Sequence, residues 1–197
     1  MATNSQAARV NQVKLNDVND SAAGGVLTSG TGTAAALGQL GKTVEFADAN
    51  EIFYDSSVGV LYPGKYQYVQ TRLASSASPA RGLIAFWYGD PTNYVVTPDA
   101  QDGELAGIYI NSLTKGYYGW IQIEGVASVK FDASQSQGTP ATKDIVVQKS
   151  SANTADALAG ATTITAAILA RVLGIAYDAP VAGTVTRVEL YEKFLNK

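Results

Sequence analysis

The carboxylates of the stretch DAQDGE are the side chains of this sequence that most resemble a metal site. Asp99, Asp102 and Glu104 lie close together along the chain, and Ca²⁺ prefers oxygen ligands of this kind. In the calcium loop of helix-loop-helix proteins, however, the glycine and the last glutamate stand at other positions. We therefore interpret DAQDGE as a solvated turn, and we interpret NDVND at residues 16–20 in the same way.

The residue types that most often perform catalysis are missing. The chain contains neither histidine, the commonest general base near neutral pH, nor cysteine, the source of thiolate nucleophiles. Motifs of serine hydrolases, Walker-type nucleotide-binding proteins, zinc peptidases and dinucleotide-binding proteins do not occur. A glycosidase needs two carboxylates about 5 to 10 Å apart, and no acidic pair stands out. We predict a protein that is not an enzyme and that uses no metal and no cofactor.

Aromatic side chains offer recognition instead of catalysis. In FWYGDP, the residues Phe86, Trp87 and Tyr88 are consecutive and precede a turn. Because side chains of a strand alternate between its two faces, at least one of the three must point outward. An exposed aromatic at a turn is more typical of a protein interface than of an active site, so we predict that all three contact a partner protein. The alternative is a sugar-binding groove, in which Trp87, Tyr88 and Tyr94 would lie together.

Composition limits the classes of partner. The chain has 197 residues, which suits one domain or a domain with an arm, and its hydrophobic fraction of 46% can form a core. Its net charge is −3 and its 14 lysines and arginines are scattered, which argues against nucleic acid as a partner. No segment approaches the roughly 20 apolar residues of a membrane helix, and the N-terminus lacks a signal-peptide core. We expect neither a nucleic-acid nor a membrane partner.

The elements that must position these residues are strands. Runs rich in aromatic and β-branched residues, such as KYQYVQ, GLIAFW and GWIQIEGVASVKF, are separated by Gly, Pro and Asp turns. Several short strands at nearly regular spacing are typical of a sandwich or barrel. We therefore predict an all-β domain over residues 61–197, with Trp120 in its core. In TITAAILARVLG the spacing of Ile and Leu also allows a short helix.

Residues 1–60 differ in composition and are predicted to form an extended or flexible N-terminal arm. SAAGGVLTSGTGTAAALGQLG is rich in Gly, Ala, Ser and Thr, which is typical of a flexible linker. The same composition allows an extended arm that becomes ordered against a partner chain. Under that second interpretation, Val10, Val13 and Leu15 contact the partner. Near the end of the segment, KTVEFADANEIFYD alternates well enough to form a strand and a turn.

Two pairs of similar segments predict two similar β units. GKYQYVQ aligns with GYYGWIQ, which matches Gly64 with Gly116, and LAGIYINSLTKG resembles VLGIAYDAPVAG, which matches Gly107 with Gly174 and Gly116 with Gly183. The units would cover residues 61–115 and 116–191. The second unit is the longer one, and we place its additional residues in QKSSANTADALAGATT.

The segments GYYGWIQIEGVASVKF, DIVVQKSS and VLGIAYDAPVAGTVTRVEL resemble small β proteins of tailed-phage structural modules. These are capsid decoration (cement) proteins and related head or fibre proteins, and the resemblance covers roughly residues 61–191. It implies a virion structural protein, assembled in the host cytoplasm, that binds across major capsid protein subunits on the capsid surface and stabilises the phage head. It also implies a homo-oligomer, a dimer or trimer, because capsid symmetry axes favour these. The alternative is a surface module that recognises a host glycan or forms the base of a head or tail fibre.

Overall fold

A computed structural model describes residues 40–46, 54–55, 59–60, 62–100, 104–110, 112–134, 140–149, 152–158, 163 and 165–191. Strands dominate this part of the chain. They are β1 (Thr43–Phe46), β2 (Tyr54–Asp55), β3 (Gly59–Val60), β4 (Gly64–Thr71), β5 (Ile84–Trp87), β6 (Val95–Thr97), β7 (Leu105–Tyr109), β8 (Tyr118–Lys130), β9 (Ile145–Gln148), β10 (Ala155–Leu158), β11 (Val172–Ala176) and β12 (Val185–Leu190). A 3-10 turn, η4 (Pro91–Asn93), and one short α-helix, α3 (Ala166–Leu169), accompany them. The prediction of a β fold is confirmed.

The first unit is a closed barrel of five strands. Its strands follow the order β4-β6-β5-β7-β8, and β8 pairs back with β4 to close the ring. Neighbouring strands are antiparallel except β4 and β6, which run parallel. Closure leaves no unpaired edge within the ring. The prediction of a barrel-like domain is therefore confirmed for this unit.

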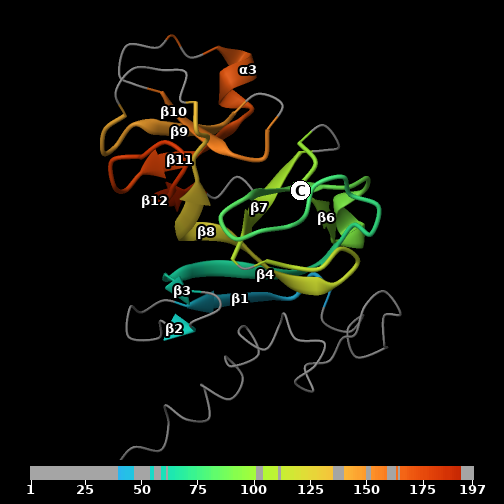
Figure 1. The fold of residues 1–197 in the computed structure, drawn as a ribbon. Helices are drawn as coiled ribbons and strands as arrows, with labels where there is room; N and C mark the ends of the chain where they lie inside the picture. The colour runs from blue at the N-terminus through green and yellow to red at the C-terminus, as the bar shows by residue number, and fades with distance from the viewer. Residues whose placement is uncertain are drawn as a thin grey trace, which may run out of the picture.

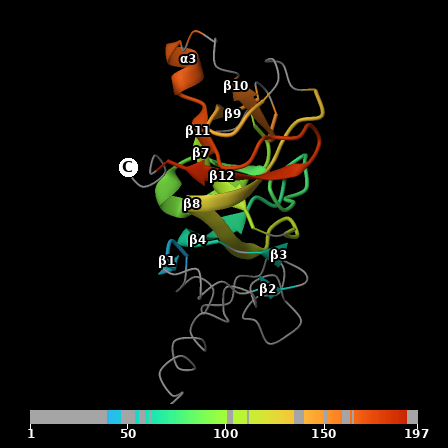
Figure 2. The same ribbon diagram turned by 90° about the vertical axis from the view of Figure 1, so that its left-hand side faces the viewer.

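The second unit repeats the strand order of the first. From β8 the sheet continues through β12, β11, β9 and β10, and a parallel bridge between Phe131 and Ala155 joins the end of β8 to β10. In this order β8, β9, β10, β11 and β12 take the places of β4, β5, β6, β7 and β8. The two units are stacked, with β9, β10 and α3 at one end, β1 and β4 at the other, and β8 between them (Figure 1, Figure 2).

Backbone hydrogen bonds recur at equivalent places in the two units. The N–H of Gly82 donates to the carbonyl of Tyr109 at 2.8 Å, and the N–H of Lys143 donates to the carbonyl of Ala176 at 2.8 Å. Gly82 and Lys143 both have a left-handed backbone, with φ of 81° and 68°. The similarity therefore extends from the order of the strands to the conformation of the turns that connect them.

The shared strand β8 decides how the two units are divided. Its first half pairs with β4 and β7, and its second half pairs with β12. The division thus falls within β8 rather than at residue 115. Gly107 and Gly174, matched from sequence, occupy the same place on β7 and β11. The match of Gly64 with Gly116 does not follow the strand order, because β4 takes the place of the second half of β8.

Three segments differ from or refine the sequence prediction. The stretch QKSSANTADALAGATT, in which the sequence places the additional residues of the second unit, contains β10, which pairs with β9. The sequence does not indicate this strand, because ADAL lacks the residue types that mark one. Within the predicted arm, TVEF forms β1 and pairs with β4, so residues 43–46 belong to the sheet. The predicted short helix is α3, which is followed by β11 at Val172. Residues 1–39 lie outside the described residues.

The units share a hydrophobic core. Inside the barrel, Ala85 and Trp87 of β5 pack with residues such as Ile121. The alternate side chains of β5, Ile84 and Phe86, point out of the barrel and pack into the core of the second unit. Strand β5 is therefore buried on both faces, which explains its uninterrupted apolar sequence.

Asp132 links the loop after β8 to the residue ahead of β10 through hydrogen bonds. Its carboxylate accepts hydrogen bonds from the ammonium of Lys149 at 2.8 Å, from the N–H of Ser134 at 2.9 Å and from the hydroxyl of Thr154 at 2.9 Å. These bonds, led by the one from Lys149, hold the pKa of Asp132 well below its usual range. The carboxylate therefore stabilises the fold in its ionised form.

We expect Asp132→Asn to lower the free energy of unfolding at pH 7 by about 1 kcal/mol, since the group is partly solvated. A depressed pKa contributes stability above the unfolded-state pKa, about 3.9 for aspartate. That contribution is lost as the pH falls below this value. Urea unfolding at pH 7 and pH 3 should therefore show a smaller fall in stability for the variant than for the wild type. Equal falls would contradict this role.

Candidate functional site

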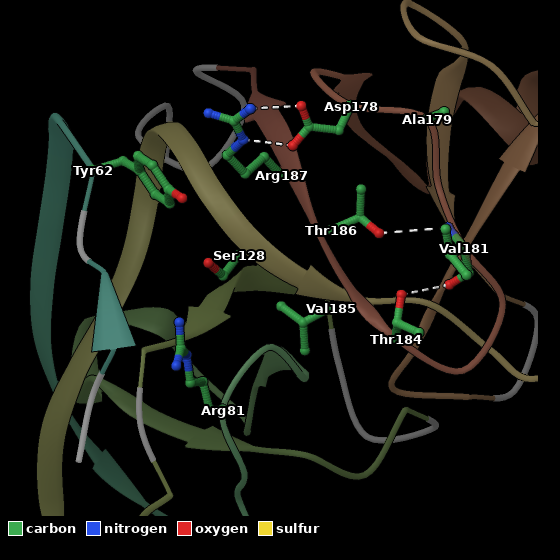
Figure 3. A pocket seen from close by; sticks show the side chains of 10 residues that line it. All are labelled: Tyr62, Arg81, Ser128, Asp178, Ala179, Val181, Thr184, Val185, Thr186 and Arg187. Atoms are coloured by element: carbon green, nitrogen blue, oxygen red, sulfur yellow. Dashed lines mark hydrogen bonds and ion pairs between the residues drawn. The ribbon is translucent and has the colours of Figure 1, made fainter. Parts of the chain in front are cut away.

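A cleft of about 520 Å³ opens where the two units meet (Figure 3). Tyr62, just ahead of β4, and Arg81, ahead of β5, line it from the first unit. Ser128 lines it from the shared strand β8, and the remaining lining residues lie between 178 and 187, in the β11–β12 turn and on β12. Ligand sites commonly form where structural units meet in this way.

The backbone next to Arg81 is fixed against β8. The carbonyl of Gly82 accepts a hydrogen bond from the N–H of Lys130 at 2.8 Å. A Cβ atom at Gly82 would lie 3.1 Å from that same nitrogen, and the φ of 81° is one that glycine adopts readily. The close approach of Gly82 to β8 thus holds Arg81 at the wall of the cleft, near Ser128.

Arg187 is occupied by partners within the protein. Its Nε and Nη2 donate to the two carboxylate oxygens of Asp178 at 2.5 and 2.6 Å. This bidentate hydrogen bonding raises the pKa of Arg187 and lowers that of Asp178. The guanidinium also lies 4.5 Å from the centre of the Tyr177 ring and 5.8 Å from that of Tyr62, distances within the range of cation–π attraction. Arg187 and Asp178 neutralise each other at one side of the cleft.

Three donors lining the cleft have no hydrogen-bond partner among the described residues. In the described part of the chain, neither the guanidinium of Arg81 nor the hydroxyls of Tyr62 and Ser128 form a hydrogen bond or ion pair. Figure 3 shows the Arg81 guanidinium extending toward Ser128, with Tyr62 beyond it. Since Asp178 neutralises one of the two lining arginines, the cleft carries one excess positive charge. Such an arrangement can hold an anionic oxygen.

At the positions that correspond to Ser128 and Arg187, the first unit has aromatic rings. Ser128 on β8 faces Arg187 on β12, and the equivalent pair in the first unit is Tyr68 and Trp120. Their rings lie 5.1 Å apart, edge to face, and Tyr118 stacks on Tyr68 at 6.3 Å. All three aromatic side chains are buried, which confirms the prediction for Trp120. In the second unit these positions are held by Ser128 and Arg187, and both line the cleft.

The rim of the cleft is apolar and exposed. Tyr177, Val181 and Val185 are 52%, 57% and 46% exposed. Val181 and Val185 line the cleft itself, and Tyr177 covers Arg187. Exposed apolar side chains gathered around tyrosine and arginine are characteristic of surfaces that bind other proteins. We refer to Tyr177, Val181 and Val185 as the apolar rim.

The aromatic contact residues predicted from sequence do not gather at this site. Phe86 and Trp87 are only 1% and 7% exposed, so neither is available as a surface contact. Phe86 does point out of the barrel, as alternation requires, but the second unit covers that face. Tyr88 is 41% exposed, and the Arg72 guanidinium lies 3.9 Å above its ring. Because Trp87 is buried, the sugar-binding groove predicted for Trp87, Tyr88 and Tyr94 is not formed by exposed rings.

The remaining residues weighed as site candidates have structural roles or lie outside the described part. Burial raises the pKa of Asp99, but hydrogen bonds from Ala77 and Ser76 outweigh this effect and leave it lowered. Asp102 is not among the described residues, and those that are contain no cluster of three or more potential metal ligands. The proposed arm contacts Val10, Val13 and Leu15 also lie outside the described ranges. Where the structure describes the chain, it contains no helix long and apolar enough to span a membrane.

Comparison of the chain with protein-family models and with curated proteins finds no match. The site therefore has to be interpreted from its own geometry. Sequence reasoning missed Tyr62, Arg81 and Arg187, which belong to no motif. The alternation in VTRVEL could have placed Arg187 on the outer face of β12, but no local signal brings Tyr62 or Arg81 to it.

Proposed function

We propose that the protein is a virion structural protein that binds across major capsid protein subunits and stabilises the phage head. The observation that carries the proposal is the apolar rim, which lies beside a cleft where the Arg81 guanidinium has no hydrogen-bond or ion-pair partner among the described residues. Tyrosine and arginine supply much of the binding energy in protein interfaces, mostly near their centre. The resemblance of residues 61–191 to phage head proteins supplies the assembly in which such a surface would bind.

The architecture suits a protein that acts by binding alone. The two units share β8 and a common core, so the body resists bending between them. A body of this kind can rest on two neighbouring capsid subunits and oppose their separation. We further propose a dimer or trimer, because symmetric copies around a capsid axis would repeat the contact. Neither a catalytic base nor a cofactor is required for this role.

The test uses heads of the encoding phage, assembled without the protein. Purified protein is added, heads are sedimented, and bound copies are counted per capsid subunit. We expect saturable binding at a fixed ratio, and bound heads should retain their DNA at temperatures that open bare heads. Absence of saturable binding, or unchanged heat resistance, would contradict the proposal and favour glycan recognition.

A paired variant locates the binding surface in the same assay. Replacing both Val181 and Val185 by lysine removes the apolar rim and should weaken binding at least about tenfold, since burying one such side chain contributes roughly 1.5–3 kcal/mol. Leu73→Lys is the matched control, because Leu73 is 71% exposed and does not line the cleft. Equal losses in both proteins would place the contact elsewhere.

A further inference from the structure

We infer that the cleft binds the carboxylate of an acidic side chain on the partner protein, and that Arg81 recognises it. The inference rests on the proposed function, because it names the chemistry with which this surface would bind the capsid. Its structural basis is a set of three donors, Arg81, Ser128 and Tyr62, that have no hydrogen-bond partner in the part of the chain that the structure describes.

The donors have complementary chemistry. A guanidinium presents N–H groups in a planar fork that matches the two oxygens of a carboxylate. The hydroxyls of Ser128 and Tyr62 line the same cleft (Figure 3) and can donate to the oxygen lone pairs that the fork leaves unused. Because Gly82 is bonded to β8, the base of the Arg81 side chain is already fixed before binding. Less conformational entropy is therefore lost when a ligand binds.

Charge favours an acidic ligand over a neutral one. Both carboxylate oxygens of Asp178 accept hydrogen bonds from Nε and Nη2 of Arg187, so Asp178 pairs with Arg187 and not with Arg81. When a partner covers the apolar rim, water is excluded from the cleft, and an unpaired guanidinium there would be strongly unfavourable. An aspartate or glutamate of the partner would satisfy it. The adjacent apolar rim predicts that apolar residues lie next to this acidic residue in the partner.

Among the described residues, the first unit has no equivalent of this site. At the equivalent positions in the first unit, Tyr68 and Trp120 pack ring against ring. Their side chains are 6% and 2% exposed, in contrast to the open cleft beside Ser128. Although the strand order is repeated, the two units therefore differ in what they can bind. One acidic residue of the partner should be engaged by each copy of the protein.

Binding to phage heads gives the first test. Arg81→Gln should weaken binding at least about tenfold, as expected for a lost hydrogen bond to a charged group. Arg81→Lys keeps the charge but loses the fork and should recover only part of the affinity. The control is Lys42→Gln, which removes an exposed cation just ahead of β1 that does not line the cleft. Unchanged binding by Arg81→Gln, or equal losses in Arg81→Gln and Lys42→Gln, would overturn the inference.

A second measurement is independent of the heads. The capped peptides Val-Asp-Leu and Val-Asn-Leu are titrated into the wild-type protein while NMR follows the Arg81 Nε–H and the Ser128 amide. Saturable shifts with the aspartate peptide, absent with the asparagine peptide and in Arg81→Gln, support the inference even if head binding fails. N-acetylneuraminic acid is titrated in the same way. No shift with the aspartate peptide overturns the inference. A shift with N-acetylneuraminic acid alone also overturns it, in favour of a glycan carboxylate as the ligand.

Discussion

Replacing Gly174 by alanine is expected to lower the free energy of unfolding by about 3 kcal/mol, the upper part of the range for overpacking. A Cβ atom at this position would lie 1.8 Å from the carbonyl oxygen of Glu189 and 2.8 Å from its carbonyl carbon. These are backbone atoms of the neighbouring strand β12, so no side chain can move aside to relieve the overlap. Strands β11 and β12 would have to separate, and the pairing between them would be lost.

Two further glycine-to-alanine variants test whether the loss of stability comes from the close approach of the neighbouring backbone. Gly107 holds the equivalent place in the first unit, and its Cβ would lie 2.6 Å from the carbonyl oxygen of Gln122, so Gly107→Ala should cost less than Gly174→Ala. Gly89 has a φ of 70° and no atom within 4 Å of a built Cβ. There Gly89→Ala should cost only the backbone strain, about 1–2 kcal/mol. Urea unfolding of the three variants should give that order, and a Gly174→Ala loss no larger than that of Gly89→Ala would contradict it.

The equivalence of Gly107 and Gly174 shows which part of the fold the sequence could predict. The similar segments around these residues lie on single strands, and alternation within each strand marks it as β. Strand β10 escaped prediction because the residues ADAL carry no local strand signal, and its place is set by β9 and by Phe131. Local patterns thus predict strands that bury one face. A strand without such a pattern, like β10, is defined by the strands with which it pairs.

The candidate site was less predictable for a related reason. Tyr62, Arg81 and Ser128 are far apart along the chain, and they line one cleft only because β4, β5 and β8 take particular places in the sheet. The alternation of Phe86 and Trp87 was interpreted correctly as pointing to two faces. The error was to treat the outer face as solvent, since a second unit built from distant residues covers it. Sequence periodicity does not reveal what lies beyond a strand.

Phe131 is the residue whose truncation should most clearly show that the two units fold together. Its side chain is fully buried in the core that also contains Ile84 and Phe86 of the first unit. Its backbone bridges the end of β8 to Ala155 on β10. A further link joins the units, because the N–H of Ile84 donates to the carbonyl of Asn153 at 2.9 Å. Removing the ring therefore leaves a cavity that weakens both units.

We expect Phe131→Ala to lower the free energy of unfolding by about 4 kcal/mol, the middle of the range for buried phenylalanines. Both tryptophans, Trp87 and Trp120, belong to the first unit, so their fluorescence reports on that unit while far-UV circular dichroism reports on both. Since the core is shared, the two signals should change at the same urea concentration in the wild type and move together in the variant. Leu73→Ala, at a side chain 71% exposed, should move neither. The contrary result is a variant whose circular dichroism changes at a lower urea concentration while its fluorescence midpoint stays at the wild-type value. That result would mean that the units unfold independently and that the shared core does not couple them.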